Sequence, residues 1–488
     1  MSKYLLRVEG VNFEYFIYDT DKIQPIRGGS YLLEESIASL VGLNLNGINL
    51  EKVMTGASIG LFSFEGQDSQ AKQVEVEVRN FLMKKTDGHA TFVVNVLENS
   101  GDFQRDYQTI TAMNRWQQFQ QPTLILPEAN SGATEQCSFD GIRPGVDSTF
   151  VPGKTFSKSV AFRIQEGRKL RQDIYRRILD DSAINSDLTF TDDLEELSKN
   201  ESKGTLNNKM AVIYFDGNRF TKIKENLCRS EDDLRKFSSI IENSRKEFLK
   251  SLLNNAKRDI DFKVRINGKE HIQLETLMWA GDELEIIVPA WKGWEVVKLF
   301  FESTKVLNFN GVALTHSGGV VFCNHKAPIQ QVRKIVRELA RVAKEKLPSN
   351  YNSLNHDQHD VFHYLIMESF DTVGPDIKNF VEQYYGRSWY EDFLLNLEQM
   401  EKVEKALLLM KSNGFPHNKV FEIIKILKTF PARLKVEVDK VLDRAFSGVN
   451  NSSDIKVAVE AIIGSSAMMT SNFDLWLMLA DLWDYVGG

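Results

Sequence analysis

The chain has 488 residues, of which 42% are hydrophobic and 26% charged, as in globular proteins of several domains. Its net charge of −7, from 60 basic and 67 acidic residues, excludes a generally basic nucleic-acid-binding surface and leaves open a local basic groove. No apolar run suits a signal peptide or a membrane helix, and three scattered cysteines form no disulfide framework, so we expect a cytoplasmic protein without membrane contact.

In residues 1–125, segments whose apolar residues recur at every second position alternate with segments whose apolar residues recur at helical spacing. They predict strands at 4–8 and 15–18, a helix at 31–43, a hairpin at 53–64, a helix at 74–84 and a strand at 90–97. This β-α-β-β-α-β order is that of the ferredoxin-like fold. Residues 126–208 begin with many prolines and glycines and predict an irregular connector that contains a helical segment at 159–179.

Residues 209–350 repeat the same order more clearly, and residues 351–488 have helical composition. The second unit predicts strands at 210–215, 274–279, 284–288 and 314–323, with helices at 231–256, 293–307 and 328–346. The last part predicts helices at 361–370, 377–382, 389–410, 419–427, 434–445, 454–468 and 473–485. The expected fold class is therefore α+β, with two ferredoxin-like domains and a C-terminal α-helical bundle.

Three carboxylates stand where strands of the second unit end. Asp216 directly follows the first strand, and Asp282 with Glu283 occupies the turn of the hairpin. Neighbouring strands of a ferredoxin-like sheet bring these positions together, and an all-oxygen set of this kind suits Mg²⁺ or Mn²⁺. Each motif by itself is also ordinary turn chemistry. Their combination within one βαββαβ unit favours a metal site that supports in-line attack on a phosphate.

Several neighbours of these acids are candidate nucleotide-binding residues. Gly217 and Asn218 open a turn whose backbone amides are suited to a triphosphate, and Gly281 lies in the hairpin turn. Arg341 and Lys344 are expected to project from the helix at 328–346 and to neutralise phosphate charge. Ser317 and the two glycines after it leave room beside the next strand.

The segments YFDGNRF, WAGDELEIIVP and THSGGVVFCNHKAPIQQVRKIVRELARVAKEKLP resemble the second palm domain of the large subunit of type III CRISPR effector complexes. That palm is related to the GGDEF cyclases. VEGVNFEYFIYDTDKIQPIRGGSYLLEE is similar to the first palm of the same family. The resemblance implies two facing palms that hold two ATP molecules and join them into cyclic oligoadenylates, antiviral second messengers read by a separate effector. It also implies contact with other effector subunits and with guide and target RNA.

Individual positions follow from that resemblance. Asp216 matches the first metal aspartate, Asp282 and Glu283 match the acidic pair, and Lys344 matches the lysine of the last palm helix. Ser30 matches the serine of the first palm, which is expected to lie near the acceptor nucleotide. The chain departs from the family pattern at Ala280, where a second glycine is usual, and in having neither the HD nuclease domain nor the full set of zinc-binding cysteines.

Other functions stay open at this point. The hairpin of the first palm has residues 55–58 in place of acids, so this palm is expected to bind no catalytic metal and to serve at most as a nucleotide-holding partner. The same carboxylates would serve a single-step cyclase that makes a 3′,5′-cyclic mononucleotide. A non-catalytic scaffold subunit, whose palms bind protein and RNA, is the alternative from a different functional class.

Overall fold

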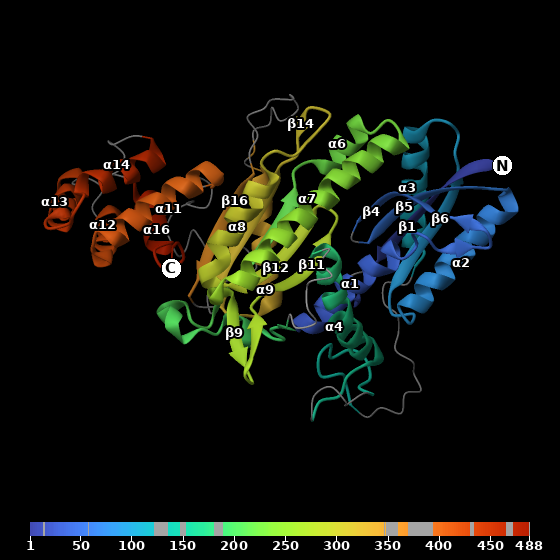
Figure 1. Ribbon diagram of the computed structural model, residues 1–488, viewed down its shortest axis with the longest axis horizontal. Helices are drawn as coiled ribbons and strands as arrows, with labels where there is room; N and C mark the ends of the chain where they lie inside the picture. The colour runs from blue at the N-terminus through green and yellow to red at the C-terminus, as the bar shows by residue number, and fades with distance from the viewer. Residues whose placement is uncertain are drawn as a thin grey trace.

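The computed structural model describes most of the chain. Its described residues are 1–487 apart from 13–14, 57, 122–134, 147–152, 180–188, 346, 348–359, 369–393, 430–433 and 465–471. Figure 1 shows a first sheet near the N-terminus, a second sheet in the middle and a group of helices at the C-terminal end. These features confirm the predicted α+β class.

The first sheet contains four antiparallel strands in the order β4-β5-β1-β6. The strands are β1 (Ser2–Val11), β4 (Glu51–Gly56), β5 (Ile59–Gly66) and β6 (Thr91–Glu98). Side chains alternate between the two faces. Leu6 packs in the same core as α1 (Ile23–Ala38) and α2 (Asp68–Lys85), and Leu5 packs in a second core with Ile110 of α3 (Phe103–Phe119). The predicted ferredoxin-like order is confirmed here.

The strand predicted at 15–18 is wrong, because this segment forms turns. Arginine side chains from the connector bind its backbone instead of a neighbouring strand. Arg143 Nη2 donates to the Tyr15 carbonyl at 2.5 Å, and Arg163 donates to the Phe16 carbonyl. Both arginines also bond the carboxylate of Asp19, whose side chain is fully buried.

Helix α4 (Lys158–Leu179) crosses α1 at two glycines. A Cβ atom on Gly28 would lie 1.8 Å from the carbonyl oxygen of Arg163, and one on Gly167 would lie 2.6 Å from Cα of Gly28. The two backbones therefore touch at this crossing. The Arg-Gly-Gly-Ser segment of the first palm has a packing role that its sequence alone does not reveal.

The second sheet repeats the strand order of the first and adds one strand, giving β11-β12-β8-β15-β16. The four strands of the repeated unit are β8 (Lys209–Gly217), β11 (Glu275–Ala280), β12 (Glu283–Pro289) and β15 (His316–Asn324). Helices α7 (Glu231–Arg258) and α8 (Ala290–Thr304) pack on the face that contains Phe215, which stacks on Phe300 at 3.7 Å. Helix α9 (Ile329–Glu345) packs on the opposite face, where the Val336 backbone abuts Gly319.

The helix predicted at 361–370 is wrong. Its described part is strand β16 (Val361–Met367), which pairs in parallel with β15. The run VFHYLIM is almost entirely buried, and a short apolar run of this kind fits a buried parallel strand as well as a helix. Residues beyond 350 therefore complete the second sheet, and the part predicted as a helical domain is not purely helical.

The remaining C-terminal elements confirm the helical prediction. They are α11 (Leu397–Ser412), α12 (His417–Thr429), α13 (Leu434–Phe446), α14 (Ser452–Ile463) and α16 (Phe473–Asp481). Helix α14 ends earlier than predicted because Gly464 adopts φ +70°, a left-handed terminating conformation. The helix predicted at 377–382 lies outside the described residues. Within the described part of the chain, no helix is long and apolar enough to span a membrane.

A buried carboxyl in α16 predicts a pH-dependent stability. Burial, and then the charge of Glu368, raise the pKa of Asp481 to about 7. The folded protein holds a proton there that the unfolded chain releases near pH 4, so the free energy of unfolding falls as pH rises from about 4 to about 7. Asp481→Asn removes this titration and is expected to stabilise the protein at pH 8 by on the order of a few kcal/mol. Melting curves at pH 5 and pH 8 test this, and an equal difference from wild type at both values would contradict it.

Candidate nucleotide and metal site

The sheet register brings Asp216 and Glu283 side by side at one end of the second sheet. Leu284 of β12 lies opposite Phe215 of β8, so Glu283 follows at the level of Asp216, and Ser317 of β15 pairs with Asp216 on the other side. Residues directly opposite each other in neighbouring strands point to the same face of the sheet. The two carboxylates therefore share the face that α9 covers.

The charge of each of the three predicted acids affects the titration of its neighbours. Burial is the main cause that raises the pKa of Asp216 and of Glu283 above the usual carboxyl range. The charge of Asp282 raises both values further. Lys344 opposes the shift at Asp216, and Arg337 opposes it at Glu283. The site is thus a cluster of like charges that positive groups partly neutralise.

Of the two cations predicted from α9, one reaches the acids and the other does not. Lys344 Nζ lies 2.6 Å from Asp216 Oδ2 and 2.9 Å from the carbonyl oxygen of Gly217. Arg341 is half exposed and pairs with Glu338 and Glu345 of its own helix. Arg341 therefore has no contact with the carboxylates in this structure.

The predicted residues next to Asp216 are engaged in hydrogen bonds and close packing with their neighbours in the fold. Ser317 donates a 2.7 Å hydrogen bond to Asn218, whose side-chain amide donates to the Thr315 hydroxyl at 3.1 Å, and both Asn218 and Ser317 are buried. A Cβ atom on Gly217 would lie 2.5 Å from the ring of Phe220, the first residue of α6 (Phe220–Leu227). These residues hold the end of β8 against β15.

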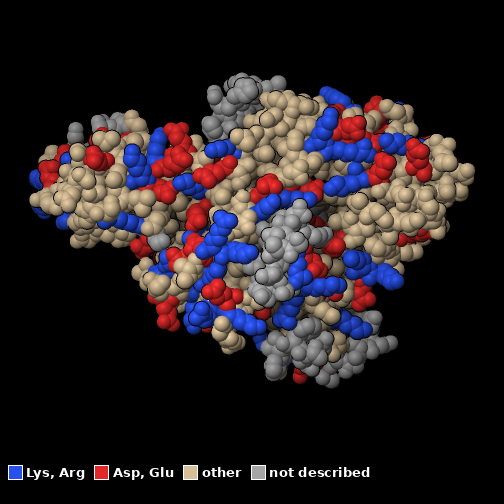
Figure 2. All heavy atoms as spheres, in the orientation of Figure 1, with Lys and Arg blue, Asp and Glu red and all other residues tan. Residues whose placement is uncertain are grey.

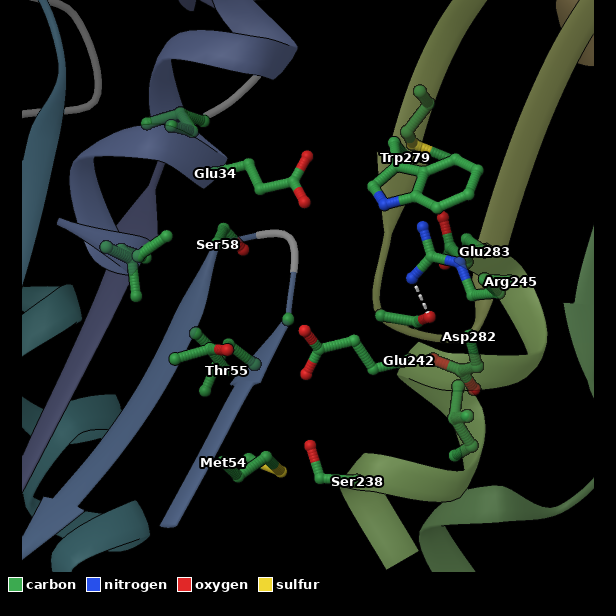
Figure 3. Close-up of a pocket in the computed structure, with 18 of the residues that line it drawn as sticks. Glu34, Met54, Thr55, Ser58, Ser238, Glu242, Arg245, Trp279, Asp282 and Glu283 are labelled. Carbon is green, nitrogen blue, oxygen red and sulfur yellow. Dashed lines mark hydrogen bonds between the residues drawn. The ribbon is translucent and has the colours of Figure 1, made fainter. Parts of the chain in front are cut away.

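A cavity of about 780 Å³ lies between the two palms, within the size range of small-molecule sites. Figure 3 shows Glu34, Thr55 and Ser58 on its first-palm side and Glu242, Arg245, Trp279, Asp282 and Glu283 on its second-palm side. Of the predicted residues, Ser30, Gly281, Asp282 and Glu283 line it, whereas Asp216, Gly217, Asn218, Ser317, Arg341 and Lys344 are not among its lining residues. The acidic hairpin thus joins the carboxylate cluster to the cavity.

The two hairpins meet at their tips. A Cβ atom on Gly56, at the end of β4, would lie only 3.0 Å from Cα of Gly281. Gly281 itself has φ +55°, in the left-handed region that favours glycine. The non-acidic hairpin of the first palm therefore supports the turn that carries Asp282 and Glu283.

A second charged group, outside the site residues predicted from the sequence, lies on the same face. The fully buried carboxylate of Glu285 bonds Arg333, and also Arg337 at 3.1 Å. Arg337 lies over the Tyr18 ring of the first palm at 5.8 Å and over the Tyr214 ring at 4.9 Å. The spacing of Arg333 and Arg337, four residues apart on a predicted helix, was the signal that they share a face.

Asp216, Asp282 and Glu283 have the donor chemistry of a hard divalent cation, because they offer only oxygen and repel one another without a counter-charge. The Lys344 ammonium already neutralises one oxygen of Asp216. Among the residues that the structure describes, no three His, Cys, Asp or Glu side chains are gathered closely enough to hold a metal ion. The three carboxylates suit Mg²⁺ or Mn²⁺ by their chemistry, but in this structure they are not close enough together to hold one ion, and Asp216 is ion-paired with Lys344.

No family model and no curated protein matches this sequence. Solved structures with the same two-palm α+β fold nevertheless cover nearly all of it. Csm1 from T. onnurineus is 14% identical with a TM-score of 0.52, over 99% of this chain and 70% of that one. The Csm1-Csm4 cassette in complex with pppApA is 13% identical with a TM-score of 0.53 (98% and 69%), and the complex with AMPPNP is 12% identical with a TM-score of 0.52 (98% and 70%).

This likeness establishes the fold. The chain has two palm domains and a helical C-terminal part, and this architecture is that of the solved Csm1 structures. The structure therefore confirms, for the fold, the resemblance that the sequence motifs showed.

Proposed function

We propose that this chain is a metal-dependent nucleotidyltransferase that joins nucleoside triphosphates, with ATP favoured, into a cyclic oligonucleotide messenger of antiviral defence. The observation that carries the proposal is that Asp216 and Glu283 lie side by side at one end of the second sheet, while Asp282 and Glu283 face the inter-palm cavity. Csm1-Csm4 cassettes of the same fold have been solved in complex with AMPPNP, pppApA and cA4, which supports a nucleotide ligand for this chain.

In this proposal the three carboxylates would hold a divalent ion, which would stabilise the attacking and leaving oxygens. The protein's own part is to keep these acids ionised and to orient the nucleotides. Lys344 and Arg337 favour the ionised forms of Asp216 and Glu283, respectively. Ser30, on the first-palm wall, holds the acceptor nucleotide, whose 3′-hydroxyl attacks the α-phosphate of the nucleotide at the acidic hairpin and releases pyrophosphate.

The test is incubation of purified protein with each of the four nucleoside triphosphates and with Mg²⁺ or Mn²⁺. Products are resolved by chromatography and mass spectrometry, with Asp282→Ala–Glu283→Ala run beside wild type. We expect a phosphatase-resistant cyclic product from wild type and none from the double variant. An assay for a 3′,5′-cyclic mononucleotide on the same samples separates single-step cyclisation from oligomer formation. The proposal is wrong if the double variant makes the same product as wild type.

A scaffold subunit is the second candidate, and the ion pair between Lys344 and Asp216 favours it. A lysine that neutralises the first metal aspartate at 2.6 Å gives a stable arrangement without metal. A scaffold should co-purify with effector subunits and guide RNA and should show no nucleotide-dependent thermal shift. Nucleotide binding without turnover would instead indicate that an activator, such as target RNA, is required.

A further inference from the structure

Arg245 of α7 is a buried cation at the wall of the inter-palm cavity, and nothing so far assigns it a role. Only 8% of the residue is exposed. Its Nη1 donates to the carbonyl oxygen of Gly281, and the guanidinium lies 4.4 Å from the centre of the Trp279 ring. Figure 3 shows the guanidinium between the indole and the acidic hairpin, facing the cavity.

Two of the hydrogen-bond donor atoms of Arg245 have no partner among the described residues. Nε and Nη2 are buried and have no hydrogen-bond partner in the part of the chain that the structure describes. Unmade hydrogen bonds of a buried charged group are costly. Burial accordingly lowers the pKa of Arg245 to about 10, although the charges of Glu34, Asp282 and Glu242 favour its protonated form.

An oxyanion is the ligand that best completes such a group. The planar guanidinium fork matches the oxygens of a phosphate, and a phosphate supplies both the missing acceptors and the counter-charge. Of the three lysines that line the same cavity, Lys52 and Lys246 already bond Glu242 at 2.9 and 2.7 Å, and the third is Lys224. The spare donors of Arg245 also lie beside the hairpin where the triphosphate is expected.

We propose that Arg245 binds a phosphoryl oxygen of the nucleotide in the inter-palm cavity through Nε and Nη2 while Nη1 continues to hold the Gly281 carbonyl. The proposal rests on the proposed function and adds a binding residue from outside the metal cluster. Because one guanidinium bonds both the ligand and the hairpin, nucleotide binding also fixes the turn that carries Asp282 and Glu283.

The test measures binding by calorimetry. The nucleoside triphosphate that wild type binds most tightly is compared with its diphosphate, monophosphate and nucleoside, for wild type, Arg245→Met and Arg245→Lys. In Arg245→Met we expect a loss of about 10- to 100-fold in affinity for the triphosphate and no change for the nucleoside. Arg245→Lys keeps the charge without the fork and should recover only part of the loss. Arg258→Met replaces an exposed arginine at the end of the same helix and serves as the control.

Melting curves show first that each variant is folded, and Arg245→Lys carries the test if Arg245→Met is not. Equal triphosphate affinity in wild type and in the folded Arg245 variants overturns this inference and leaves the proposed function standing. An equal loss for nucleoside and triphosphate also overturns it, because that result indicates a structural role. A wild-type protein that binds none of the four triphosphates overturns both proposals.

Discussion

Asp216→Asn is expected to reduce nucleotide joining by at least about 1000-fold while the free energy of unfolding changes little. Asparagine has nearly the same shape as aspartate but offers a neutral, weaker metal ligand. The folded protein destabilises the charge of Asp216 by burial and stabilises it by the ion pair with Lys344. Because the Asp216 side chain is 26% exposed, both effects are small, and they oppose each other. Their combined loss therefore leaves the free energy of unfolding nearly unchanged.

The measurement is product formation per unit time with Mg²⁺ and with Mn²⁺, together with denaturant unfolding of the same preparations. Asp21→Asn is a suitable control, because Asp21 is an exposed aspartate of the first palm. Retention of more than a tenth of wild-type activity in Asp216→Asn would contradict the role of Asp216 as a metal ligand. Loss of activity with a large fall in stability would instead identify it as a structural residue.

Gly28→Ala is expected to lower the free energy of unfolding by about 3 kcal/mol. The added methyl group would meet the carbonyl oxygen of Arg163 at 1.8 Å, and backbone of one helix cannot yield to another as a flexible side chain can. Helix α4 must move away, and this movement disturbs the bonds of Arg163 to Asp19. Thermal or denaturant unfolding of the variant measures the effect.

Gly66→Ala is the matched control for this substitution. A Cβ atom on Gly66 would meet its nearest neighbours at 3.5 Å, an ordinary contact distance. We expect its stability to stay within about 0.5 kcal/mol of wild type. Equal stability of the two glycine variants would show that α1 and α4 do not touch as described.

The two sheets could be predicted from the sequence because the apolar residues of the strands in each βαββαβ unit follow a recognisable pattern and the helices between them are long. Prediction failed where a segment takes its conformation from distant partners. Residues 15–18 have the composition of a strand, yet Arg143 and Arg163 bind their backbone and no strand pairs with it. Strand β16 has seven residues, too few for its apolar run to distinguish a buried strand from a helix.

The candidate site shows the same division. The three acids were predictable because strand ends and hairpin turns meet in a known sheet order. It was harder to predict which cations of α9 reach the acids. Each step of four residues rotates a side chain by about 40° around the helix axis, so Arg341 lies off the face that Arg333 and Lys344 share. Arg245 carries no sequence signal at all, since its importance comes from the turn and the indole that α7 packs against.

Strand β16 has a consequence for any attempt to isolate the second palm. It covers one side of β15 along seven consecutive residue pairs. A fragment that ends near residue 350 would leave the amides and carbonyls along that side without partners, and an uncovered strand of this kind attracts other chains into sheet pairing and aggregation. By covering this strand, the C-terminal part prevents sheet pairing between chains, and a soluble minimal palm must retain β16 or a substitute for it.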